Sequence, residues 1–356
     1  MPPPLVRFLP LALLLLGCWA IRTSLFITNT LTGCPIEGSG RQIFNAEPGI
    51  DTATNFDVVL KHTEGNGWKM WDRQKSLSRD RVSCNYRRFV PRFAPEKNVT
   101  MCLHDPDVDV ISGDIAEFGR WKYCDALVVE YQHAASFFRK EKASGRRKLF
   151  YIEAGANIGS CVLEMLLSTN AEIIAFEPDP RNLAQLTTTL MAMDPAYRNR
   201  VALFPIALGS ERGSSTIHTA ADNRGNALVG QPVPDYKNQM FLPPVQISVE
   251  ALDDLIDLND GDVAFPLIKM DVQGFECRVI DGMRKVLGAT SSVKSEAESK
   301  LLAANGCSVE GMLQRLRDAR FADTELDKSG DILARKYSRR KGSFLDRHRY
   351  QKSVNK

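Results

Sequence analysis

The chain has 356 residues, which is enough for one large α/β domain with extensions or for two modest domains, and we favour the former. Its residues are 44% hydrophobic and 25% charged, values that exclude a disordered chain and a polytopic membrane protein. The net charge of +3 identifies no class of partner, and we expect no specific binding of nucleic acid.

The N-terminus carries a targeting segment, because residues 8–21 are uniformly apolar. This run is shorter than the ~20 residues that cross a bilayer comfortably, and Cys18-Trp-Ala20 supplies the small residues that a signal peptidase requires. Alternatively, Leu25-Phe-Ile27 extends the run past Arg22 into a single-pass anchor. Residues 1–27 are therefore predicted to be a signal peptide or a signal anchor. Either one sends the domain into the secretory pathway, secreted or membrane-anchored with the catalytic domain in the lumen.

Residues 28–120 are predicted to form a stem and an N-terminal extension. The first part, 28–80, is rich in Gly, Thr, Asn and Asp and has no sustained period. The second part alternates more clearly, and Asn98–Leu103 with Asp107–Ile111 predict a short strand pair.

Cysteine usage points to an oxidising compartment without a metal site. Apart from Cys18, the cysteines are odd in number and form no Cys-x-x-Cys pair, which argues against zinc or a thioredoxin-like centre. In an oxidising lumen the first expected disulfide joins Cys84 and Cys102, because that loop is short and spans the glycosylation sequon Asn98-Val-Thr100. Cys161 and Cys277 are interpreted as small core residues rather than nucleophiles.

Helical and strand patterns alternate from residue 121 to 335, which predicts a doubly wound, mostly parallel, Rossmann-like sheet. The expected elements are helix 124–141, strand 148–153, helix 157–168, strand 171–177, helix 180–193, strand 201–206, an inserted loop and hairpin over 209–249, strand 265–271, helix 276–287, strand 292–297, helix 308–318 and a terminal pair near 321–335. The basic residues 336–356 are interpreted as a solvated tail, and binding of anionic lipid or nucleic acid is the alternative.

The turn after the first core strand reads Glu153-Ala-Gly-Ala-Asn-Ile-Gly159. Gly155 and Gly159 allow backbone angles closed to other residues and a close approach to a ligand. Glu177, at the end of the next strand, can accept hydrogen bonds from both hydroxyls of a ribose. A dinucleotide fingerprint has glycine where this chain has Ala-Asn157, and Glu153 would repel a pyrophosphate but suits the cationic amino-acid end of S-adenosylmethionine. The residues expected to hold that cofactor are Glu153, Gly155, Asn157, Gly159, Glu177 and Asp271.

A second cluster lies in Pro266–Glu276, an apolar strand that ends at Asp271 and is followed by a glycine turn. Lys269, Asp271 and Glu276 should gather at the same sheet edge as Glu153. These three are the catalytic candidates. Asp271 is interpreted as a base or polar anchor for a substrate, or else as a residue that caps the following helix or bonds a loop amide. Glu276 suits either a substrate contact or a helix start, and Lys269 either catalysis or neutralisation of Asp271.

These runs together resemble the FkbM family of S-adenosylmethionine-dependent methyltransferases. The matching runs keep the family's order and spacing and are found at 153–159, 176–178, 206–210, 248–255 and 268–276. The resemblance covers roughly residues 120–335 and implies a class I methyltransferase sheet with a terminal antiparallel strand. The chain departs from the family at Gln273, where Glu is usual, and at the unusually polar 292–296.

The resemblance implies a methyltransferase, and we expect O-methylation of a hydroxyl on a glycan, a lipid or a small metabolite. One alternative is a catalytically degenerate binding or scaffold protein, which Gln273 and the polar 292–296 favour and the retained cofactor residues disfavour. A nicotinamide-dependent oxidoreductase is the other alternative, and the missing middle glycine and the 268–276 run disfavour it.

Overall fold

The computed structural model describes residues 55–61, 67–77, 82–140, 148–231, 240–259, 263–326 and 330–337, all within one compact unit that begins at Thr52. The predicted targeting segment 1–27 and the tail from residue 338 lie outside the described residues. Within the described part, no helix is long and apolar enough to cross a membrane.

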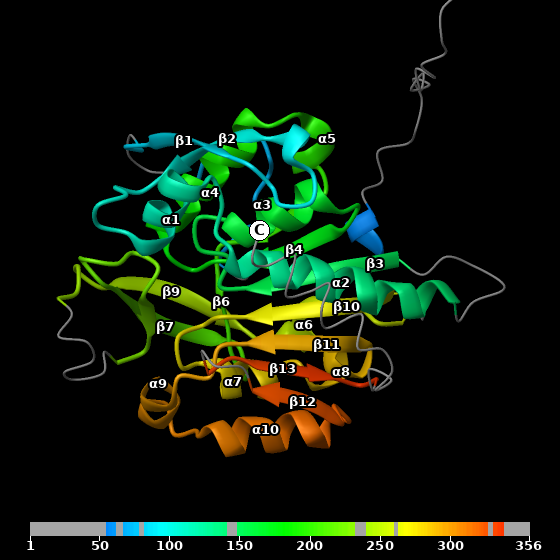
Figure 1. Ribbon diagram of the computed structural model, residues 1–356. Coiled ribbons are helices and arrows are strands. Elements are labelled where there is room, and N and C mark those ends of the chain that lie inside the picture. Colours follow the sequence, from blue (N-terminus) through cyan, green and yellow to red (C-terminus); the bar gives the residue numbers. More distant parts are fainter. Residues whose placement is uncertain are drawn as a thin grey trace, which may run out of the picture. The chain divides into compact units, whose positions relative to one another are not determined.

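A seven-stranded sheet forms the centre of this unit (Figure 1), with the strand order β12-β13-β11-β10-β3-β4-β5. The strands are β3 (Lys148–Ala154), β4 (Glu172–Phe176), β5 (Val201–Phe204), β10 (Val263–Met270), β11 (Thr290–Ser295), β12 (Asp323–Leu326) and β13 (Ile332–Arg335). Neighbours from β11 to β5 pair in parallel, whereas β13 is antiparallel to both β11 and β12. The predicted doubly wound sheet and its terminal antiparallel strand are therefore confirmed.

Each face of the sheet is covered because successive side chains in a strand point to opposite faces. In β3, Phe150 and Ile152 enter one buried cluster and Tyr151 enters the other. Helices pack on both faces and are named in chain order: α2 (Tyr123–Lys140), α3 (Ser160–Ser168), α4 (Pro180–Ala192), α5 (Pro195–Arg198), α6 (Leu252–Leu255), α7 (Glu276–Asp281), α8 (Arg284–Gly288), α9 (Ser299–Ala304) and α10 (Val309–Asp318).

The predicted helix 276–287 is two helices, α7 and α8, with Gly282 between them. A Cβ built on Gly282 would lie 1.9 Å from the carbonyl oxygen of Gly209, so the chain passes too close to that loop for a continuous side-chain-bearing helix. The short α9 was not predicted.

The N-terminal extension packs into the same unit. Its described elements are the turns η1 (Asn55–Val58) and η2 (Pro95–Lys97), strands β1 (Asn85–Phe89) and β2 (Val99–Leu103), and helix α1 (Val110–Phe118). The predicted strand at 107–111 is wrong: β2 pairs with β1, and Asp109 caps α1 by accepting a hydrogen bond from the Ser112 amide. Trp71 and Phe89 are buried in the same cluster as the helices beside the sheet.

Three disulfides join segments of this unit. The predicted bond between Cys84 and Cys102 is present. Cys161 and Cys277 are buried, as expected of core residues, and each is bonded, to Cys124 and to Cys307. Both of these bonds tie the helix that follows a predicted site turn, α3 or α7, to a neighbouring segment.

The insertion between β5 and β10 forms a small second sheet, in agreement with the predicted loop and hairpin over 209–249. Its strands are β6 (Ala207–Leu208), β7 (Gly213–Thr219), β8 (Ala227–Val229) and β9 (Val245–Glu250), in the order β6-β9-β7-β8. Its apolar residues pack with Phe275, next to the turn after β10.

The polar residues of β11 have partners. The Ser292 hydroxyl donates to Glu130 Oε1 over 2.8 Å, and Arg335 of β13 donates to both oxygens of the same carboxylate over 2.9 and 3.0 Å. A buried ion pair between α2 and β13 therefore accounts for a strand that lacks the usual apolar pattern.

Candidate active site

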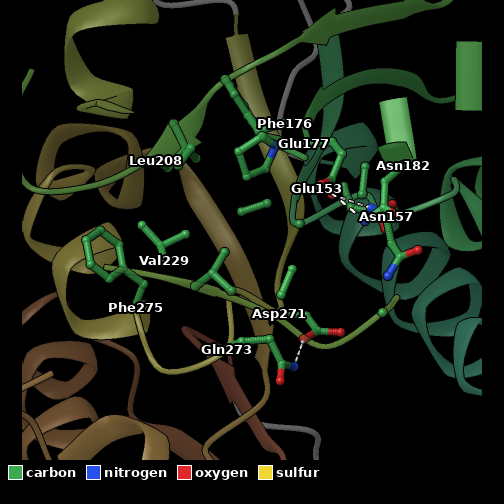
Figure 2. Close-up of a pocket in the computed structure, with 18 of the residues that line it drawn as sticks. Glu153, Asn157, Phe176, Glu177, Asn182, Leu208, Val229, Asp271, Gln273 and Phe275 are labelled. Carbon is green, nitrogen blue, oxygen red and sulfur yellow. Dashed lines mark hydrogen bonds between the residues drawn. The ribbon is translucent and has the colours of Figure 1, made fainter. Parts of the chain in front are cut away.

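The strand order reverses between β3 and β10, and ligands in open α/β sheets bind in the crevice beyond the carboxyl ends of such strands. A pocket lies there, with about 680 Å³ of empty space that includes open solvent. Figure 2 shows Leu208, Val229 and Phe275 gathered on one side of it, and Glu153, Asn157, Glu177 and Asn182 on the other. The pocket thus combines an apolar wall with a few convergent polar groups, as small-molecule sites do.

The glycine turn forms one edge of the pocket. Gly155 has a φ of 79°, and its amide donates to the carbonyl of Phe176 at the end of β4 over 3.0 Å. Asn157 also has a positive φ, 51°. Gly155 and Asn157 line the pocket, whereas Gly159 does not: it begins α3, and a Cβ there would lie 2.3 Å from Leu186 Cδ1. Gly159 therefore serves the packing of α3.

Glu177 lines the pocket and also holds the turn in place. Its Oε2 accepts the Asn157 amide over 2.6 Å, and its Oε1 accepts the Asp179 amide over 2.9 Å. Burial, and then the charge of Asp179, raise the pKa of Glu177 to about 7. Asn182 of α4 is buried beside it and also lines the pocket. A carboxylate has about four acceptor positions, so Glu177 retains capacity for ribose hydroxyls.

Lys269 connects the two predicted clusters. Its buried ammonium donates to the carbonyl of Gly155 over 2.7 Å and lies 3.4 Å from Glu153 Oε1 and 3.6 Å from Asp271 Oδ2. Burial lowers the pKa of Lys269, but the charges of Asp271 and Glu153 outweigh it and hold that pKa above its ordinary value. Burial raises the pKa of Glu153 to about 7 despite Lys269. One ammonium thus faces two carboxyl groups, which suits a cationic ligand.

Asp271 lines the pocket, with 22% of its side chain exposed. Gln273 Nε2 donates to Asp271 Oδ1 over 2.8 Å, as Figure 2 shows, and to Glu296 Oε2 over 2.5 Å. Among the described residues no side chain caps α7, whose cap position is Phe275, so the helix-cap interpretation of Asp271 is wrong.

Glu276 does not line the pocket. It is buried at the start of α7, and its Oε1 accepts the Val272 amide over 3.2 Å. Burial raises its pKa to about 7. Glu276 therefore holds the turn that carries Asp271, and the structure places Lys269 and Asp271, but not Glu276, beside the pocket.

Sequence reasoning missed Gln273 and Trp121, which line the pocket, and Glu296, which accepts a hydrogen bond from Gln273. Gln273 and Glu296 lie at the two places where the chain departs from the family pattern, and these departures were the only indication of them in the sequence. Burial and then the charges of Asp271 and Glu276 raise the pKa of Glu296 to about 9. Trp121 precedes α2 and reaches the pocket through tertiary packing that no local pattern encodes.

S-adenosylmethionine fits the residues present. Glu153 lines the pocket, where its carboxyl group can face the cationic amino-acid end of the cofactor. The turn approaches so closely that a Cβ on Gly155 would lie 2.0 Å from the Asp271 carbonyl oxygen. Phe176, Ile206 and Leu208 offer apolar surface beyond Glu177. Glu153, Asn157 and Glu177 would hold the cofactor on the β3–β4 side.

The sheet order, the antiparallel β13 and the acidic residue after β4 define a class I methyltransferase. Residues 153–321 match the model of the methyltransferase FkbM domain. The chain therefore carries an FkbM methyltransferase domain, and its cofactor is S-adenosylmethionine, as the sequence predicted.

A curated relative, 2-O-methyltransferase NoeI of Sinorhizobium fredii, is 28% identical over 196 residues, which cover 52% of this chain and 78% of the relative. A solved methyltransferase from Geobacter sulfurreducens is 14% identical with a TM-score of 0.33 and covers 66% of this chain and 90% of its own. The N-terminal domain of EvdMO1, solved in the presence of SAH and D-fucose, is 9% identical with a TM-score of 0.29, over 58% of this chain and 82% of that one. At these TM-scores the two structures support no inference about this chain.

Proposed function

We propose that this chain transfers the methyl group of S-adenosylmethionine to a hydroxyl oxygen on a glycan, a lipid or a small metabolite. The observation that carries the proposal is Asp271, a partly exposed carboxylate that lines the pocket and lies in an ion pair with Lys269. The name of the relative from Sinorhizobium fredii, a 2-O-methyltransferase, supports an oxygen acceptor.

The chain's residues have separate tasks in this reaction. When bound, S-adenosylmethionine supplies an electrophilic methyl group and departs as a neutral thioether. Glu177 and the glycine turn hold the adenosine side, and Glu153 faces the amino-acid side. Asp271 Oδ2 accepts the proton of the acceptor hydroxyl, and Lys269 keeps that carboxylate in position. Because the acceptor and the methyl carbon must be aligned, much of the rate gain comes from positioning.

Labelled methyl transfer tests the proposal. We would incubate the purified protein with S-adenosylmethionine carrying a ¹³C methyl group and with extracts divided into glycan, lipid and small-molecule fractions. The expected result is a labelled O-methyl group in one fraction, identified by NMR. Label on nitrogen or carbon, or binding of the cofactor without transfer in any fraction, would contradict O-methylation. The second of these outcomes would favour a scaffold protein.

The location of the domain is a further part of the proposal: the secretory pathway, reached through residues 1–27. Three disulfides within the described residues support an oxidising compartment. Asn98 of the sequon lies in the turn between η2 and β2, and Thr100 is exposed. Membrane attachment through the N-terminal segment is the form that an uncleaved anchor would take.

A further inference from the structure

A second group of polar and aromatic side chains lies beyond the residues assigned to the cofactor, at the ends of β10 and β11 and just before α2. Asp271 follows β10 and Glu296 follows β11, and parallel strands bring these ends to one edge. Gln273 bridges the two carboxyl groups with its amide nitrogen. Trp121, Asp271 and Gln273 all line the same pocket.

An aromatic wall faces this group. The rings of Trp121 and Tyr123 stack with centroids 4.8 Å apart and planes 24° from parallel, and Trp121 is half-buried. Burial and the nearby charges of Asp331, Asp271 and Glu296 raise the pKa of Tyr123 well above its ordinary value. The phenol therefore stays protonated, and its proximity to these charges places it beside the carboxyl cluster. The outer ring, Trp121, presents its surface to the pocket.

Gln273 has an unusual backbone conformation. Its φ of 52° lies in the left-handed region, which non-glycine residues seldom occupy without support. Gly274 follows with a φ of 95°, and a Cβ there would lie 2.6 Å from the carbonyl oxygen of Leu301. The tight turn against α9 therefore fixes the amide of Gln273 between Asp271 and Glu296.

Together these groups provide an aromatic surface and a set of polar groups, which are complementary to the two kinds of surface on a sugar ring. A pyranose has an apolar face of C–H groups and a rim of neighbouring hydroxyls, each a donor and an acceptor. The flat face of Trp121 suits the first surface. Asp271 can accept a hydrogen bond from a hydroxyl and the Oε1 of Gln273 is a further acceptor, while Glu296 accepts the Gln273 amide and holds it in place. A simple apolar alcohol has a single hydroxyl and so offers no second hydrogen-bond donor to Gln273.

We propose that the methyl acceptor is a saccharide ring that lies against Trp121 and is oriented through its neighbouring hydroxyls by Gln273, which Glu296 holds in place, with Asp271 at the reacting hydroxyl. This inference rests on the proposed function and narrows its acceptor to one class. Gln273 and Glu296 are positioning residues, and Trp121 determines specificity.

The test uses the full folded protein loaded with SAH, so that binding is measured apart from activity. Saturation-transfer NMR with a panel of methyl glycosides, and with cyclohexanol and phenol as matched non-saccharides, should show binding of one or more glycosides alone. Labelled methyl transfer from S-adenosylmethionine should select the same glycosides. Trp121→Ala and Glu296→Ala should each raise the KM for the glycoside about tenfold. The Kd for SAH should stay within about twofold of wild type. Tyr86→Ala removes an aromatic ring that is exposed on β1 and does not line the pocket, and it should change neither value.

Different outcomes would refute the proposed function and the saccharide inference. Loss of SAH binding in the wild type, or transfer to no acceptor of any kind, would refute the proposed function itself. SAH binding without glycoside binding, transfer to cyclohexanol or phenol in preference to every glycoside, or an unchanged KM in both Trp121→Ala and Glu296→Ala would overturn the saccharide inference alone. Trp121→Phe retains a ring and should restore most of the affinity lost in Trp121→Ala.

Discussion

The carbonyl oxygen of Asp271 lies so close to the backbone of Gly155 that no side chain fits at position 155. A Cβ built on Gly155 would be 2.0 Å from that oxygen. The Asp271 amide in turn donates to the carbonyl of Ala154 over 3.1 Å. The cofactor turn and the candidate catalytic residue are therefore held against each other by backbone atoms. A change in one turn must displace the other.

Gly155→Ala should impair both cofactor binding and turnover. The substitution combines a φ of 79° with a contact far shorter than van der Waals distance. We expect a loss of at least about 1 to 3 kcal/mol in stability or SAH affinity. Calorimetry and thermal unfolding measure the two. Gly213→Ala is the matched control, because no atom lies within 4 Å of its added Cβ and its φ is not in the left-handed region. Equal behaviour of the two variants would contradict the close approach.

Glu177→Gln should weaken SAH binding while leaving the fold intact. In the wild type, the two carboxylate oxygens accept the backbone amides of Asn157 and Asp179. Glutamine has only one side-chain oxygen and no charge, so it has fewer acceptor positions for these amides and for the ribose. Hydrogen bonds to a charged group contribute about 1.5 to 3 kcal/mol, which sets the expected loss of binding free energy. Glu211→Gln, an exposed position outside the pocket, serves as the control. An unchanged Kd for SAH would place the ribose elsewhere.

Glu296 should make stability depend on pH. Its pKa is about 9 in the folded chain against an ordinary value of 4.5, so between these values the folded state holds a proton that the unfolded state releases. The stability that this proton contributes is fully present below pH 4.5 and is lost as the pH rises towards 9. The other buried glutamates titrate near 7, so we would compare unfolding temperatures between about pH 7.5 and pH 9.

In that pH interval the unfolding temperature of the wild type should fall as the pH rises. The fall should be smaller in Glu296→Gln, because the amide does not titrate. Glu211→Gln should decline as the wild type does. Identical slopes for Glu296→Gln and the wild type would show that the pKa of Glu296 is not raised in the folded chain.

Passage through the secretory pathway should leave a glycan on Asn98. The full-length protein expressed in a eukaryotic host is expected to gain mobility on glycosidase treatment, and Asn98→Gln should abolish that shift. Asn98 Oδ1 accepts a hydrogen bond from Arg88 over 3.0 Å, and its Nδ2 donates to the carbonyls of Pro95 and Glu96 over 3.3 and 3.4 Å. All three bonds are exposed, so the substitution should cost little stability. Recovery of the whole protein in the cytosol with its cysteines reduced would refute the proposed location.

The central sheet was predictable from sequence because its strands are short apolar runs between glycine turns, and alternation with helices leaves few topologies. The same logic placed Glu153, Glu177 and Asp271 at one edge. The break at Gly282 was not predictable, since it depends on contact with Gly209, which is distant in sequence. The strand β1 escaped prediction because Tyr86, Arg87 and Arg88 give it no buried alternation.

The acceptor side of the site was less predictable than the cofactor side. A glycine turn is a local signal, whereas Trp121 and Gln273 come to line one pocket only through tertiary packing. The polar sequence of β11 gave an apparent conflict with a buried strand, which the structure resolves with the partners Glu130 and Arg335. Polar residues in a core strand indicated long-range pairing here, which a single sequence does not reveal.

Single-turnover methyl transfer by Asp271→Asn tests the central claim most directly. The amide keeps the shape of the carboxylate and loses its charge and basicity, so cofactor affinity and the unfolding temperature should remain close to those of the wild type. Removal of a general base should lower the rate of transfer by about 10² to 10⁴. A rate equal to that of the wild type, in a variant that binds SAH and unfolds normally, would contradict the assignment of Asp271 as the group that activates the acceptor hydroxyl.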